Sequence, residues 1–288
     1  MRPIKLITLL LISLLLTIAM AGCDKQETDS ASALTPSTTA QSSNTAENSG
    51  FGGSLLDGSG RELYPDLDFI EKDDLKSNIL DYTLIDIRSN FEYRTAHMVD
   101  AISIPASDPA FTERLRNLVR KHRPQVVLYG NGGNDRSAHK AARVATKAKV
   151  ENVFVYDGSM QDWATSYPEQ SLLNGDEIDL DNPLLGEEEF APKLLSDDEF
   201  REKVTSEKGI LLDIRDESDS NRHPLQGIAV INPLDHSASL TALLEEVKAN
   251  ETPLFIFDDY GYKVRWFMYL LEQHELENYY FLKDGLLN

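Results

Sequence analysis

The chain carries few of the side chains that perform covalent or metal chemistry. Its single thiol, Cys23, excludes an internal disulfide, a thiolate zinc site and a Cys-x-x-Cys redox centre. Its histidines show no i, i+4 spacing and no spacing to the cysteine that would predict a metal site. We therefore expect neither a metal nor a cofactor. The histidines are His97, His122, His139, His223, His236 and His274.

A short charged motif occurs twice. Asp86-Ile87-Arg88 returns as Asp213-Ile214-Arg215, in each case at the end of an apolar run. We interpret both motifs as ion pairs or hydrogen-bonding partners that hold strand ends, rather than as catalytic groups.

One glycine-rich segment, which we call the first loop (residues 130–136), could bind a small anion or an acidic segment of a partner without a nucleophile. Three glycines and two asparagines ahead of a helix can turn several N–H groups inward, and such a nest binds oxyanions. The alternative is a remnant loop beside a solvated basic helix face, and both interpretations stay open. The loop and the start of the helix comprise Gly130, Asn131, Gly132, Gly133, Asn134, Asp135, Arg136 and Ser137.

An internal repeat shows which elements must position these residues. Leu84–Arg88 recurs 127 positions later as Leu211–Arg215, and Val155–Gly158 recurs at the same offset as Leu282–Gly285. Between them Val126–Tyr129 corresponds to Leu254–Phe257, at an offset of 128. Three apolar runs in one order and near-constant register indicate two copies of one fold.

Each copy alternates short apolar strands with helices. The helices are expected at 71–80, 112–122 and after the first loop in one copy, and at 196–204, 240–249 and after the loop that follows Leu254–Phe257 in the other. Ser196 with Glu199 has the form of a capping box. Short strands are expected at 101–105 and 228–233. The pattern predicts an α/β fold of two domains, each a mainly parallel sheet with helices on both faces and its site at the carboxyl ends of the strands.

Each copy resembles a rhodanese domain, and the pair resembles the two-domain sulfurtransferases. The resemblance rests on Asp86-Ile87-Arg88, on Glu92-Tyr93, on the segment Ala96–Ala101 and on Val153–Ser159 with Trp163. The second copy keeps Asp213-Ile214-Arg215, His223, Gly227 and Asp284-Gly285, and it ends before a closing Trp.

In active members of that family the loop after the central strand begins with a cysteine, whose thiolate carries sulfur as a persulfide. Gly130 stands at this position in the first copy and Asp258 in the second. The second loop (residues 258–263) keeps Gly261 and has Lys263 where the family has arginine. Glycine cannot attack a substrate and a carboxylate cannot carry persulfide sulfur, so neither loop is expected to be catalytic.

The amino terminus resembles the export signal of bacterial lipoproteins. Arg2 and Lys5 precede the apolar run Leu6–Met20, which at 1.5 Å per residue spans roughly 22 Å, less than the ~30 Å of a membrane core. Met20-Ala21-Gly22-Cys23 is similar to a lipobox, which implies that the Cys23 thiol receives a lipid. An ordinary signal peptide with a neighbouring cysteine is the alternative. By the sorting rule of enteric-type bacteria, Asp24 would favour the inner membrane.

Charge excludes one class of partner. The chain has 28 basic and 48 acidic side chains, which give a formal charge of −20. Residues 168–288 hold 10 of the basic and 27 of the acidic side chains. Nucleic-acid binding needs a surplus of Lys and Arg and is not expected.

The resulting domain prediction has five parts. They are a lipoprotein signal peptide at 1–22, a lipid-anchored disordered linker at 23–60, a first repeat at 61–167, an acidic linker at 168–190 and a degenerate second repeat at 191–288.

The function expected from these observations is binding without catalysis. A lipoprotein of the bacterial cell envelope, anchored through Cys23 on the periplasmic side, would bind an envelope partner protein or a small oxyanion. The alternative is a thiosulfate or persulfide sulfurtransferase that works with a thiol supplied by a partner.

Overall fold

The computed structural model describes residues 60–122, 125–215, 230–231 and 237–287. All of them fall within one compact unit, Ser54–Asn288. The signal peptide, Cys23, most of the predicted disordered linker and the second-repeat residues His223 and Gly227 lie outside the described residues.

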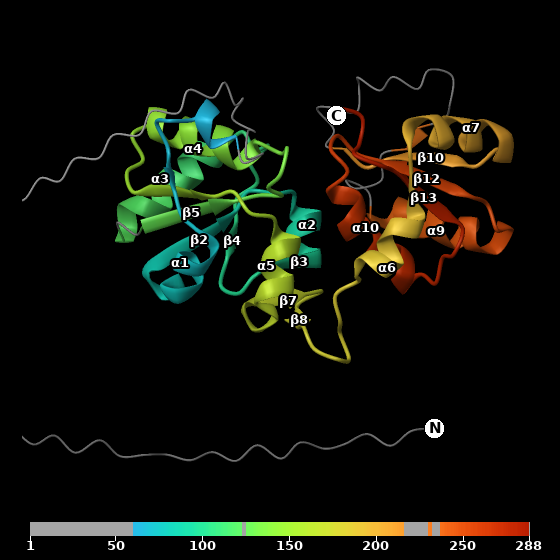
Figure 1. Ribbon diagram of the computed structural model, residues 1–288, viewed down its shortest axis with the longest axis horizontal. Helices are drawn as coiled ribbons and strands as arrows, with labels where there is room; N and C mark the ends of the chain where they lie inside the picture. Colours follow the sequence, from blue (N-terminus) through green and yellow to red (C-terminus); the bar gives the residue numbers. More distant parts are fainter. Residues whose placement is uncertain (1–59, 123–124, 216–229, 232–236, 288) are drawn as a thin grey trace, which may run out of the picture. The chain divides into compact units, whose positions relative to one another are not determined.

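The first repeat is built on a five-stranded parallel sheet in the order β1-β6-β5-β2-β4 (Figure 1). Its strands are short and apolar, as the sequence predicts for a sheet covered on both faces. They are β1 (Asp68–Phe69), β2 (Tyr82–Asp86), β4 (Ile102–Ser103), β5 (Gln125–Tyr129) and β6 (Val153–Tyr156).

Helices cover both faces of this sheet because successive strand residues point to opposite sides. Val126 and Leu128 pack in one buried cluster with residues of α3 and α4, whereas Val127 and Tyr129 pack in another with residues of α1 and α5. Trp163 of α5 is fully buried in the second of these clusters. The helices are α1 (Lys72–Ser77), α2 (Asn90–Thr95), α3 (Phe111–His122), α4 (Ser137–Lys147) and α5 (Met160–Ser166), with 3-10 turns at Arg61–Leu63 and Ile79–Asp81.

The second repeat has a sheet of the same order, β9-β13-β12-β10-β11, again parallel throughout. Strand by strand, β9 corresponds to β1, β13 to β6, β12 to β5, β10 to β2 and β11 to β4. The prediction of an α/β fold with mainly parallel sheets flanked by helices is therefore confirmed. The strands are β9 (Leu194–Leu195), β10 (Ile210–Asp213), β11 (Val230–Ile231), β12 (Leu254–Phe257) and β13 (Tyr279–Leu282).

Helices also cover both faces of the second sheet. Leu212 and Ile256 pack in one buried cluster with residues of α9 and α10, and Phe255 packs in another with residues of α7. The predicted capping box is present at the start of α7, where Ser196 Oγ accepts from Glu199 N and the Glu199 carboxylate accepts from Ser196 N. These helices are α7 (Asp197–Glu207), α9 (Ser237–Asn250) and α10 (Lys263–Gln273).

The segment 168–190 differs from the simple tether that its charge predicts. Leu173 and Ser171 are buried in β7, which pairs with β3 in a small antiparallel sheet. Leu173 belongs to a buried cluster of the first repeat, and the pairing of β7 with β3 attaches the segment to that repeat; a count of charges does not reveal either contact. Its elements are a 3-10 turn at Pro168–Gln170, β7 (Ser171–Leu173), β8 (Asp176–Glu177) and α6 (Glu187–Phe190), with a 3-10 turn at Ala191–Lys193 after it; β3 is Ala96–Met98.

Contacts between the repeats centre on α10. The rings of Phe91 in α2 and Phe267 in α10 lie 5.8 Å apart, and Trp266 and Tyr269 of α10 belong to a buried cluster of the first repeat. The Tyr269 hydroxyl accepts a hydrogen bond from Leu185 N at 2.8 Å. The last helix is therefore both a core element of the second repeat and a packing surface for the first.

Candidate functional site

The candidate site lies where β2, β5, β10 and β12 end, because the loops that follow parallel strands meet at one edge of each sheet. The two Asp-Ile-Arg motifs and both predicted loops begin here. The residues that the sequence singles out in each repeat are thus brought together by strand order alone.

A buried ion pair fixes the end of β2. Arg88 donates to the Asp86 carboxylate through its backbone N at 2.9 Å and through Nη2 at 2.6 Å, and Nη2 also donates to Ala96 O. Burial works to lower the pKa of Arg88, but the charge and hydrogen bonds of Asp86 outweigh burial and hold that pKa above its usual range. The guanidinium lies over the rings of Trp266 and Tyr129, 5.5 and 5.8 Å from their centroids. A structural role, as predicted, fits this geometry.

The second motif repeats the arrangement at the end of β10. Arg215 donates to the Asp213 carboxylate through its backbone N and Nε at 3.0 Å and through Nη2 at 2.8 Å. Its Nη1 lies 3.7 Å from Oδ1 of Asp259 in the second loop. Both predicted ion pairs are confirmed.

Gly130 leaves the position of the missing nucleophile without a side chain. A Cβ placed there would lie 3.0 Å from Ser137 Oγ and 3.5 Å from Ile87 Cδ1. The next two glycines of the loop, Gly132 and Gly133, have φ of 67° and 56°, which favours glycine. The loop therefore keeps a turned backbone around a position that carries no reacting group.

Polar groups of the chain already engage much of the first loop. The Asn131 amide donates to Glu92 Oε1 at 2.9 Å, and the other oxygen of this buried carboxylate caps α2 through Ser89. Asn134 N donates to the hydroxyl of Tyr262, from the second repeat, at 2.7 Å.

A carboxylate also occupies the start of α4. Asp135 accepts from Ser137 N and from Ser137 Oγ, both at 2.8 Å, and Arg136 donates to Gly133 O. The position that a bound anion would take at a helix N-terminus is therefore filled by an anion of the chain itself.

The second loop is closed in the same way, and more completely. The Asp258 carboxylate accepts backbone hydrogen bonds from Gly261 at 2.5 Å, from Lys263 at 2.5 Å and from Val264 at 3.2 Å. Asp258 is only 3% exposed. Burial raises the pKa of Asp258, while these N–H groups and the charge of Lys263 act in the opposite direction. The residue at the cysteine position is thus an internal ligand of its own loop.

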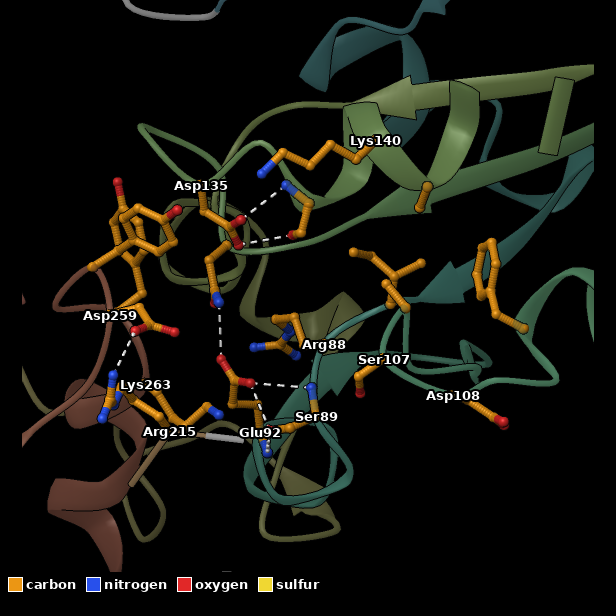
Figure 2. A pocket seen from close by; sticks show the side chains of 18 of the residues that line it. Arg88, Ser89, Glu92, Ser107, Asp108, Asp135, Lys140, Arg215, Asp259 and Lys263 are labelled. Carbon is orange, nitrogen blue, oxygen red and sulfur yellow. Dashed lines mark hydrogen bonds and ion pairs between the residues drawn. The ribbon is translucent and has the colours of Figure 1, made fainter. Parts of the chain in front are cut away.

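One pocket of about 570 Å³ is lined by residues of both repeats. Figure 2 shows Arg88 and Glu92 on one side of it and Arg215 and Asp259 on another, with Lys140 of α4 above. We call it the shared pocket. Its size and its place at strand ends are typical of ligand sites in α/β proteins.

Sequence reasoning missed the role of two residues at this site. Glu92 stands three residues after Ser89, a capping-box spacing that could have indicated its role at α2. Tyr262 gave no signal, because its contact with Asn134 depends on how α10 packs against the first repeat.

Two further properties concern only the described part of the chain. Within it, no group of three or more His, Cys, Asp or Glu side chains is arranged to hold a metal ion. None of its helices has the length and apolar character that crossing a membrane requires.

Part of the first repeat matches a known family of domains. Residues 71–166, about a third of the chain, match the family described as "Rhodanese-like domain". No curated protein matches the chain.

Several solved structures are similar in fold. A rhodanese-related protein from Thermoplasma volcanium is 25% identical, with 34% of this chain and 92% of that chain covered and a TM-score of 0.30. The rhodanese-like domain of an Anabaena protein is 24% identical, with coverages of 34% and 74% and a TM-score of 0.30. A thiosulfate sulfurtransferase from Pseudomonas aeruginosa is 16% identical over 76% of this chain and 41% of that chain, with a TM-score of 0.34.

Proposed function

We propose that this protein, whose residues 71–166 are a rhodanese-like domain, binds a partner without transferring sulfur and is held at a bacterial envelope membrane through Cys23. The second repeat would be a degenerate rhodanese-like domain. Its sheet, with the same strand order as the first, supports this assignment.

The observation that carries the proposal is the state of the two nucleophile positions. Gly130 has no side chain, and the Asp258 carboxylate is buried and held by three backbone N–H groups. Sulfur transfer by this fold needs a thiolate in such a loop. This chain keeps the sheet, the ion pairs and the loop geometry but has no thiolate in either loop. It can therefore bind a partner but cannot form a persulfide there.

Of the two ligands expected from the sequence, the geometry favours a partner protein over a small oxyanion. Asp135 and Asp258 stand where an oxyanion would meet the starts of α4 and α10. An incoming sulfate or phosphate would have to displace or tolerate these carboxylates at close range, which is unfavourable.

Turnover of thiosulfate tests the absence of catalysis. The purified full chain is incubated with thiosulfate and cyanide, with an active rhodanese as the positive control. A second series adds glutathione, which supplies the thiol that the alternative requires. We expect thiocyanate formation at the background rate in both series. Turnover in the first series contradicts the proposal, and turnover only with glutathione supports the sulfurtransferase alternative.

Thermal unfolding in sulfate and in chloride of equal ionic strength tests the oxyanion. A ligand that binds the folded state raises the melting temperature, and we expect equal values in the two salts. Partition into a detergent phase tests the anchor, because a lipidated chain follows the detergent and the Cys23→Ser variant stays in water.

A further inference from the structure

The first repeat supplies the apolar wall of the shared pocket, in which Ile87, Phe111 and Ala141 are almost fully buried. Val144 of α4 continues this wall and is 48% exposed. An apolar side chain from a ligand could contact this wall and remove the exposed part of Val144 from water.

The charged groups of the pocket leave an excess of carboxylates. Arg88 and Arg215 are paired with Asp86 and Asp213, which lie behind the lining. Asp108 is paired in the same way with Arg114, outside the lining, at 2.8 Å. The lining also contains the cations Lys140 and Lys263 and the carboxylates Glu92, Asp135, Asp258 and Asp259.

This local excess has the same sign as the charge of the whole chain, −20. Such a field attracts a cationic partner and repels an anionic one before contact. Asp259 already lies 3.7 Å from Arg215 Nη1, and it is placed to meet a second cation because its side chain is 22% exposed and is directed into the pocket in Figure 2.

One donor at the pocket calls for an acceptor. Arg88 is 4% exposed, and its Nη1 is buried with no hydrogen-bond partner among the described residues. Since Asp86 and Glu92 already lie near this guanidinium, a neutral carbonyl oxygen suits Nη1 better than a further carboxylate. A polypeptide backbone offers such oxygens at every residue.

We propose that the shared pocket binds an extended segment of a partner protein in which an apolar residue stands next to a basic one. The inference rests on the proposed binding function and specifies the partner's chemistry. The apolar side chain packs on Ile87, Phe111 and Val144, the basic side chain pairs with Asp259, and a backbone carbonyl is available to Arg88.

Four labelled peptides test this proposal against the full chain by fluorescence anisotropy. They share the frame Ac-Gly-Ser-X-Z-Gly-Ser-NH₂, with X-Z being Phe-Arg, Phe-Gln, Phe-Glu or Ser-Arg. We expect Phe-Arg to bind tightest, about fivefold tighter than Phe-Gln and at least about tenfold tighter than Phe-Glu, because a partly exposed ion pair contributes modestly. Ser-Arg is expected to be weaker than Phe-Arg, because it lacks the apolar contact.

Two matched variants locate the binding. In Asp259→Asn the Phe-Arg and Phe-Gln peptides should bind about equally, whereas Glu246→Gln should keep the preference for Phe-Arg. Glu246 is exposed on α9 and does not line the pocket. Equal binding of Phe-Arg and Phe-Glu, an unchanged preference in Asp259→Asn, or no binding up to about 1 mM would each overturn the proposal.

The peptide experiment and the thiocyanate assay distinguish failure of this proposal from failure of the proposed function. Failure of all four peptides in a chain that also forms no thiocyanate rejects the basic–apolar segment and leaves the non-catalytic assignment in place. Thiocyanate formation rejects that assignment whatever the peptides do.

Discussion

Replacing Asp258 by asparagine removes the charge that the second loop is built around and keeps the size of the side chain. The carboxylate accepts three backbone N–H groups, and hydrogen bonds to a charged group contribute about 1.5–3 kcal/mol each. An asparagine keeps one acceptor and turns an NH₂ group toward donors. Relief from burying a charge offsets part of the loss. We expect Asp258→Asn to lower the free energy of unfolding by about 2–4 kcal/mol, or roughly 5–12 °C in melting temperature.

Asp259→Asn is the control, because it changes the neighbouring residue in the same way. Asp259 makes an ion pair of 3.7 Å with Arg215 and its side chain is 22% exposed, so its loss should cost no more than about 1 kcal/mol. Urea unfolding of the full chain is followed by tryptophan fluorescence, in which Trp266 of α10 reports on the helix that follows the loop. Equal stability of Asp258→Asn and wild type would refute the assignment of Asp258 as an internal ligand.

Three further predictions follow from the same loops and from α4. Gly133→Ala should destabilise the protein by about 1–3 kcal/mol, because φ is 56° and the new Cβ would clash with the Tyr262 hydroxyl. Urea unfolding should show a smaller loss of stability when the same substitution is made in the Tyr262→Ala variant. Gly130→Cys should fold, because the Ser137 hydroxyl, which would lie 3.0 Å from the new Cβ, can rotate away from it. It should nevertheless form no thiocyanate, because a carboxylate stands at the helix start; turnover would contradict this. Burial lowers the pKa of His139, so the folded state binds its proton less readily than the unfolded chain and loses stability as pH falls below 6.5. This decline below pH 6.5 should be shallower in His139→Leu, and equal slopes of stability against pH, measured by urea unfolding, would contradict the prediction.

The amino-acid pattern predicts the architecture well where apolar runs decide it. Val126–Tyr129 and Leu254–Phe257 are buried strands because no other element can hide four consecutive apolar residues so compactly. The Asp86–Arg88 and Asp213–Arg215 pairs were predictable for a related reason, since a charged pair directly after a buried strand must satisfy itself locally.

The site was less predictable because its contacts join distant residues. Asn134 and Tyr262 are 128 positions apart, and no local pattern indicates that α10 brings them together. The role of Asp258 also depends on geometry. From the sequence, a carboxylate at this position only argues against an anion site; the structure shows that it accepts three backbone N–H groups of its own loop. The nest predicted at residues 130–136 stays a prediction as an oxyanion site, with Asp135 at the start of α4 as the main argument against it.

The central claim is that the folded repeats contain no group that can accept sulfur. Peptide mapping by high-resolution mass spectrometry, after the full chain is incubated with thiosulfate, measures this directly. An added sulfur atom increases a peptide's mass by about 32 Da, and accurate mass separates it from two oxygen atoms. The account predicts that any such increase is confined to the peptide containing Cys23. A sulfur adduct on any peptide from residues 61–288 would contradict it.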